Sequence, residues 1–280
     1  MKRRSNFANL VTVELRALLL DKWTLMLMAA YTLFTSAIFF NESFRNSRVQ
    51  LIGHNLFITV TNHYLPLFLI LMVLVVISPV FAADKKDGVV DLVDTCRNGK
   101  VRWRLSKIIA ALLYVIAIVL VGFLITFLMS ILSKTPLNPG SIAFEESKPA
   151  LMLTNAQFFV FSFFMIVFAT CFLVLFTLFI SSRTSDLLIP LAGAAMFVGI
   201  EFAIFSFGRP YFLWNLNIFR LFVPWYLLFD SLPPFGPAIR TLIIILSVLI
   251  ILSCILTFLT LHADRKLVKV KNVKKEESKI

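Results

Sequence analysis

The stretch DKKDGVVDLVDTCRNGKVRWRLSK, residues 84–107, is the longest polar interruption between two long apolar runs. The apolar runs, 65–83 and 108–132, are each long enough to cross a membrane as a helix, which takes about 20 residues. Residues 84–107 are therefore predicted to form a loop that joins two spans on one side of a membrane.

The first half of this loop is predicted to be a short helix with two faces. At helical spacing, one stripe is apolar and comprises Val89, Leu92, Val93 and Cys96. Another stripe is acidic and comprises Asp84, Asp87, Asp91 and Asp94. The second half has cations around Trp103, namely Arg97, Lys100, Arg102, Arg104 and Lys107. Such a composition suits the lipid headgroup layer, so we expect the loop to lie against the cytoplasmic membrane face.

The rest of the chain repeats this alternation of apolar and polar segments. With 280 residues, 59% hydrophobic composition and a mean hydropathy of +0.90, it has too many uninterrupted apolar runs for a soluble core. We predict an all-α membrane protein, a six-span helical bundle with both termini cytoplasmic. The transmembrane domain is residues 23–262, with spans at about 23–40, 63–83, 108–132, 154–180, 187–207 and 241–261.

The N-terminal region 1–22 is predicted to be a cytoplasmic tail followed by a helix in the membrane interface. Its apolar residues recur every three or four positions, at Phe7, Val11, Leu15 and Leu18. Glu14 and Arg16 would be costly in hydrocarbon, which argues against the alternative, a helical extension of the first span. At the other end, 263–280 is predicted to be a basic cytoplasmic tail.

Prolines and short connections mark the remaining features of the bundle. Pro66 and Pro79 interrupt the second span, where neighbouring helices are expected to tolerate the breaks. The connection SSRTSD, 181–186, is so short that spans four and five should form an antiparallel hairpin. Segment 208–238 carries charges, prolines and aromatic residues, and is predicted to form one or two short helices at the outer interface.

The cations are distributed unevenly between the two predicted sides. Five Lys and Arg residues precede the first span, seven lie in the 84–107 loop, one is Arg183 and seven follow Leu261. Seven of the 27 Lys and Arg residues remain for the other side. An excess of Lys and Arg on one side is typical of the cytoplasmic face. The net charge of +12 is therefore a sign of membrane topology and lipid contact, and no nucleic-acid partner is expected.

Motifs of catalysis and cofactor binding do not fit this sequence. The nearest approach to a phosphate-binding loop, DTCRNGKV at 94–101, lacks its first glycine and its hydroxyl residue. The pair Glu145-Glu146 matches an intramembrane protease poorly, and the three cysteines suggest neither a disulfide nor a metal site. We expect no enzyme activity, no metal and no cofactor in this chain.

Glu201 is the most informative ionisable residue within a span. An acid at that depth is costly, so it should face protein or water and have a partner. Two interpretations remain open: it lines a substrate path, or it fixes the packing of neighbouring helices.

The chain resembles the membrane subunits of type-2 ABC exporters, which are bacterial permeases with six spans. The resemblance rests on the span plan and on two local stretches, the first of which matches in two parts: KKDGVVDLV at 85–93 and RWRLSKIIA at 102–110, and then VELRALLLDKW at 13–23. The two parts of the first stretch match the loop after span two, and the second stretch matches the interfacial entry helix. Val89 stands where the family usually has Thr, and Cys96-Arg97 stands where a Pro is common.

The resemblance implies that the loop helix and the entry helix contact a separate ABC ATP-binding subunit, which holds ATP and Mg²⁺. The residues implied in this contact are Asp84, Asp87, Gly88, Val89, Asp91, Leu92 and Val93, with Glu14 and Arg16. A second permease subunit, identical or related, would complete the substrate path. The physical pattern agrees, because an apolar stripe can fill a groove on a partner while the acidic stripe steers it. The alternative is that the loop only folds against the inner membrane face.

The leading expectation is therefore a permease subunit in the plasma membrane of a bacterium, which exports an amphipathic substrate such as a lipid or a peptide. A membrane anchor or sensor that recruits a cytosolic protein without transport is the alternative. An ion-driven transporter fits less well, because such proteins usually need more charged groups within their spans than Glu201 alone.

Overall fold

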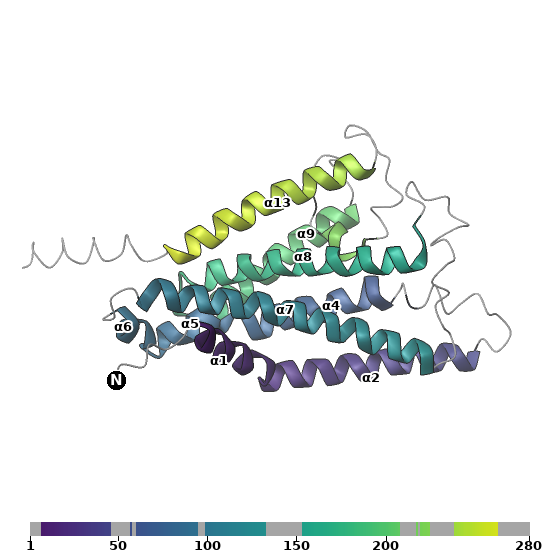
Figure 1. Ribbon diagram of the computed structural model, residues 1–280, viewed down its shortest axis with the longest axis horizontal. Coiled ribbons are helices and arrows are strands. Elements are labelled where there is room, and N and C mark those ends of the chain that lie inside the picture. The colour runs from purple at the N-terminus through teal and green to yellow at the C-terminus, as the bar shows by residue number, and fades with distance from the viewer. Residues whose placement is uncertain are drawn as a thin grey trace, which may run out of the picture.

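The computed structural model describes residues 7–45, 57, 60–94, 99–132, 153–207, 217, 219–224 and 238–262. Among these residues the chain is helical and contains no strand. Six helical stretches in this part of the chain are long and apolar enough to cross a membrane, at 22–41, 60–86, 101–132, 155–181, 188–206 and 242–261. The predicted fold class, an all-α membrane protein with six spans, is confirmed (Figure 1).

The long helices run side by side along the bundle in Figure 1. Five spans are single helices, and these are α2 (Lys22–Arg45), α7 (Gly99–Leu132), α8 (Asn155–Ser181), α9 (Leu188–Phe207) and α13 (Ala238–Leu261). The second span is made of four consecutive pieces, η1 (Val60–Tyr64), α4 (Leu65–Met72), η2 (Val73–Ile77) and α5 (Pro79–Lys86). Three short helices complete the described fold: α1 (Phe7–Leu19), α6 (Val89–Asp94) and α11 (Phe219–Phe222).

Spans two, three and four form the centre of the bundle. About half or more of each is buried, whereas only 11% of the fifth and sixth spans is buried. The central core joins residues such as Leu69, Tyr114 and Ile166 from α4, α7 and α8. The outer helices expose large apolar side chains along their length, as is expected of surfaces that face lipid.

The second span is segmented because it contains two prolines. Each proline lacks a backbone N–H and crowds the preceding turn, so the regular hydrogen-bond ladder cannot run through it. A π-helical segment precedes each of them, Val60–Tyr64 before Pro66 and Val73–Ile77 before Pro79. At the second break the Ser78 amide donates to the Val73 carbonyl, five residues back, at 3.2 Å. The span nevertheless stays packed among its neighbours, as expected.

The N-terminal helix α1 is separate from the first span, which excludes the alternative of a continuous extension. The chain turns at Leu20–Asp21, and the Asp21 carboxylate accepts a hydrogen bond from the Trp23 amide at 2.9 Å. This bond caps the start of α2. Helix α1 packs along α7 with Val11 buried and Leu15 and Leu18 against the core, whereas Phe7 is exposed.

Hydroxyl groups hold α2 against α7 at two levels. The Tyr31 hydroxyl lies 2.6 Å from Thr126 Oγ1, and Thr24 Oγ1 lies 2.9 Å from the Tyr114 hydroxyl. These four side chains satisfy one another inside the bundle, where an unpaired hydroxyl would be costly.

The connection 84–107 contains the short helix predicted for its first half, α6, but it is more helical than predicted. Asp84 belongs to α5, and α7, which forms the third span, begins at Gly99 rather than at Ile108. Trp103, Arg104 and Lys107, which were expected in the headgroup layer, are buried between helices. The reason is that each cation finds oxygen partners on other helices, as described below.

The remaining connections follow the prediction where the structure describes them. Helix α8 ends at Ser181 and α9 begins at Leu188, so spans four and five form the expected hairpin. Asp186 caps α9 by accepting from the Leu188 amide at 2.9 Å. The tail 263–280, and most of 208–238 apart from α11, lie outside the described residues.

Candidate functional site

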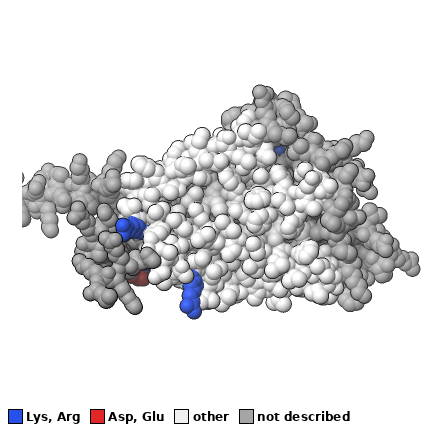
Figure 2. All heavy atoms as spheres, in the orientation of Figure 1, with Lys and Arg blue, Asp and Glu red and all other residues white. Residues whose placement is uncertain are grey.

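One end of the bundle gathers the residues that the sequence singles out. Helices α1, α5 and α6, the start of α7, and the ends of α8 and α13 meet there, at the left of Figure 1. We call this end the α1 end. On the face shown in Figure 2, most of the charged side chains that are visible lie toward the α1 end, and the remaining described surface is almost uncharged.

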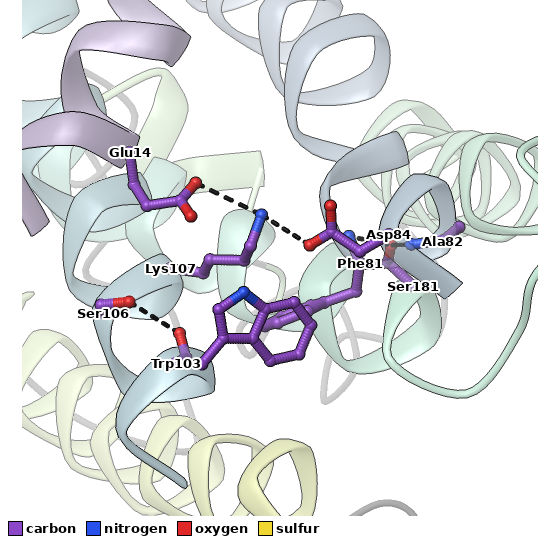
Figure 3. A network of polar contacts seen from close by, with 8 residues as sticks. All are labelled: Glu14, Phe81, Ala82, Asp84, Trp103, Ser106, Lys107 and Ser181. Carbon is purple, nitrogen blue, oxygen red and sulfur yellow. Dashed lines mark hydrogen bonds and ion pairs between the residues drawn. The ribbon is translucent and has the colours of Figure 1, made fainter. Parts of the chain in front are cut away.

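A three-residue ion cluster lies at the centre of the α1 end. The Lys107 ammonium lies 2.7 Å from the Asp84 carboxylate and 3.2 Å from the Glu14 carboxylate (Figure 3). The Lys107 side chain is only 8% exposed, the Glu14 side chain is 23% exposed and the Asp84 side chain is 21% exposed. Because one cation serves two carboxylates, Lys107 holds α1, α5 and α7 together electrostatically.

Local packing fixes the position of Lys107. Trp103 lies one turn earlier on the same face of α7, and its ring centroid is 5.4 Å from the ammonium. The indole also meets the ring of Phe81 on α5 edge to face, with 5.6 Å between centroids. The same patch of α7 therefore contacts α5 through both an aromatic pair and an ion pair.

Arg104 joins the third span to the sixth. Its Nη1 donates to the carbonyls of Thr260 and Leu261, at 3.0 and 3.3 Å, and the side chain is almost fully buried. These carbonyls end α13 and have no partner within the helix, and a cation at a helix C-terminus is electrostatically favourable. Arg104 thus fixes the end of α13 on α7.

Ser181 and Lys85 join α5 to α8. The Ser181 hydroxyl oxygen accepts hydrogen bonds from the amides of Phe81 and Ala82, at 3.2 and 3.1 Å. In return, the Lys85 ammonium donates to the Ser182 carbonyl at the end of α8. The end of span two is therefore connected by side chains to α1, α7 and α8.

A sharp turn at Gly88 separates α5 from α6. Gly88 has a φ of +73°, a conformation that a residue with a side chain rarely adopts, and its own surroundings are open. Beyond it, Val90 is buried, Val93 packs against the core and Val89 is half-buried. Asp87, at the end of α5, is exposed. We call Asp87–Val89 the elbow.

The residues predicted for partner contact are thus divided by the structure. Glu14 and Asp84 meet at Lys107, whereas Asp87, Gly88 and Val89 form the elbow. Arg16 is exposed on α1, and Val93 contacts the core of its own bundle. The side chains of Asp91 and Leu92 lie outside the described residues.

Glu201 lies on α9, remote in sequence from the elbow and near the end of its span. It is half-buried, and its backbone carbonyl accepts from the Asn217 side chain at 2.7 Å. Nearby in sequence, Arg220 on α11 is fully buried. This contact ties α9 to Asn217 through the backbone, so the role of the Glu201 side chain, in a substrate path or in packing, stays a prediction.

The roles of Lys107, Arg104 and Ser181 were not predicted from the sequence. A signal existed for Lys107, because Asp84 ends one span and Lys107 begins the next. Consecutive antiparallel spans bring such residues to the same level of the bundle. No comparable signal exists for Arg104, whose partners lie more than 150 residues away.

Side-chain contacts join several helices at the α1 end. Within the described residues, no group of three His, Cys, Asp or Glu side chains could hold a metal ion. Ion pairs and hydrogen bonds from α5 and α7 reach α1, α8 and α13, and the elbow follows α5 directly, with its Asp87 side chain exposed.

Comparison of the sequence with protein-family models finds no match. Comparison with curated proteins likewise gives no match.

Proposed function

We propose that this chain is the membrane subunit of an exporter driven by a separate ATP-binding subunit, which docks on the elbow at the α1 end. The observation that supports this most is the Glu14–Lys107–Asp84 cluster behind the elbow. A force applied to α6 reaches α5 and α7 directly through the chain, and it reaches α1 through Lys107. An elbow connected in this way can convert movement of a bound partner into movement of spans two and three.

The charges favour this end as the cytoplasmic one, where ATP is available. Exposed or half-buried cations at the α1 end of the described chain include Arg16, Lys22, Lys85, Lys86 and Arg183. An excess of Lys and Arg near span ends is typical of the cytoplasmic side. The exposed Asp87 carboxylate at the elbow would then face a basic patch on the partner.

The substrate of the proposed exporter is amphipathic, such as a lipid or a peptide, and the membrane is the bacterial plasma membrane. The spans offer mainly apolar and aromatic side chains, and a second membrane subunit would enclose the substrate path with them. Helices α9 and α13 carry the least buried of the six described spans, and their exposed apolar side chains can contact such a subunit or lipid.

A charge reversal at the elbow tests the docking. The chain is reconstituted in proteoliposomes with the ATP-binding protein encoded by a neighbouring reading frame, and ATP hydrolysis is measured. Asp87→Lys should lower the stimulated hydrolysis about tenfold or more, because the added cation repels the basic patch. Membrane expression should be unchanged, because Asp87 is exposed.

The matched control is Asp186→Lys, which makes the same change of charge at the same end of the bundle. Asp186 is also exposed, but it lies on the α8–α9 turn, and losing its cap costs only about 1 kcal/mol. This variant should keep stimulated hydrolysis within about twofold. Equal hydrolysis by the two variants would remove the docking claim.

The anchor hypothesis is a second candidate, because Val90 and Val93 of α6 pack on their own bundle rather than outward. An anchor holds its partner without moving. In the same proteoliposomes it would bind the partner but show no dependence of ATP hydrolysis on added substrate lipids or peptides.

A further inference from the structure

The second span differs from the other described spans in the continuity of its helix. Among the six, it alone contains π-helical segments. The segment Val73–Ile77 is followed by Ser78 and then Pro79, and the Ser78 amide bonds to the Val73 carbonyl instead of to the regular acceptor four residues back. Such an irregularity in a helix often marks a point where it bends.

The piece beyond this break, α5, is held by contacts from other helices rather than by one continuous ladder. Two amides in the first turns of α5, those of Phe81 and Ala82, share the single hydroxyl oxygen of Ser181 on α8. At the far end, Lys85 and Asp84 reach α8 and α7 through their side chains. These contacts can be released while the helical bonds within α5 stay intact.

The shared acceptor concentrates two contacts of α5 in one hydroxyl group, that of Ser181. A hydroxyl that accepts two amides at 3.2 and 3.1 Å forms two long bonds, whereas backbone bonds cluster near 2.9 Å. Ser181 is fully buried, so water does not compete for these amides in the arrangement described. Loss of this one oxygen would leave both amides without their present acceptor on α8.

We propose that span two bends at Val73–Pro79, so that α5 and the elbow swing relative to α4, and that the Ser181 hydroxyl is the latch that holds one of the two positions. The hinge is a property of this chain alone. It does not depend on the proposed ATP-binding partner, and its test is made without one.

The test measures distances between two spin labels across the hinge, by pulsed electron paramagnetic resonance in lipid nanodiscs. Cysteines replace Leu67 on α4 and Lys86 at the end of α5, both of which are exposed, in a chain whose native cysteines have been replaced. The control pair is Leu113 and Leu132, both exposed on the unbroken helix α7. Each pair is 19 residues apart, or about 28 Å along a straight helix.

The hinge predicts two distances for the 67/86 pair and a single narrow distance for the 113/132 pair. Ser181→Ala should raise the ratio of the second population to the first about fivefold, the effect expected from losing hydrogen bonds of ordinary strength. Pro79→Ala should reduce the second population, because the restored amide allows the regular ladder to continue.

The neighbouring serine supplies the control substitution. Ser182 Oγ donates to the Phe179 carbonyl within its own helix, so Ser182→Ala should leave the 67/86 distances unchanged. A 67/86 distribution as narrow as that of α7 and unaltered by Ser181→Ala would overturn the hinge. Broadening of both pairs in Ser181→Ala would also overturn it, because the variant would then loosen the whole bundle.

Discussion

At the scale of single residues, Lys107 makes the main electrostatic contacts between helices at the α1 end. A cation of this kind was expected in the headgroup layer, because its neighbours in sequence are basic and aromatic. It instead lies between Glu14 and Asp84, since α1, which carries Glu14, and the last turn of α5, which carries Asp84, both meet α7 at that level. Composition identified the charged segment, but only the folded contacts decide whether a charge faces lipid or protein.

Removing the Lys107 charge should destabilise the bundle. Lys107→Met keeps the length of the side chain but leaves two partly buried carboxylates facing each other, at an expected cost of about 2 kcal/mol. The measurement is thermal unfolding of the purified protein in detergent. Adding Glu14→Gln and Asp84→Asn to the variant should recover more than half of the lost stability. A triple variant no more stable than Lys107→Met would show that the cluster does not act through charge.

At the scale of helices, the apolar runs predict the structure well. The expected spans agree with the observed ones within a few residues except at the start of the third, which begins inside the basic stretch. Hydrophobicity marks where lipid contact begins, whereas Gly99–Lys107 stays helical because Arg104 and Lys107 find partners on α13, α1 and α5. Such distant partners cannot be inferred from the local pattern.

Close packing between α7 and α4 depends on a glycine. A Cβ atom at Gly122 would lie 2.5 Å from Leu65 Cδ1, and Leu65 is buried. Gly122→Ala should therefore be less stable than Gly199→Ala by about 1–2 kcal/mol through overpacking, measured by thermal unfolding. Gly199→Ala on α9 is the matched control, because its surroundings are open, and it should be neutral or slightly stabilising. Equal effects of the two substitutions would contradict the tight α4–α7 contact.

At the scale of the whole molecule, six spans bring α1 and the end of α13 to the same end of the bundle (Figure 1). The sequence predicted this architecture from hydrophobic run lengths alone. The candidate site was predictable only in part: Asp84 and Glu14 were selected for partner contact, yet in the structure they hold helices together behind the elbow.

The most direct measurement is the accessibility of the elbow in intact bacteria. A cysteine at Asp87 and, for comparison, one at Asn41, which is exposed at the far end of α2, are treated with a membrane-impermeant maleimide. If an ATP-binding subunit docks on the elbow, position 87 will be labelled only after the cells are opened, and position 41 will be labelled from outside. Labelling of position 87 in intact cells would contradict the account, because no ATP-binding subunit could then reach the elbow.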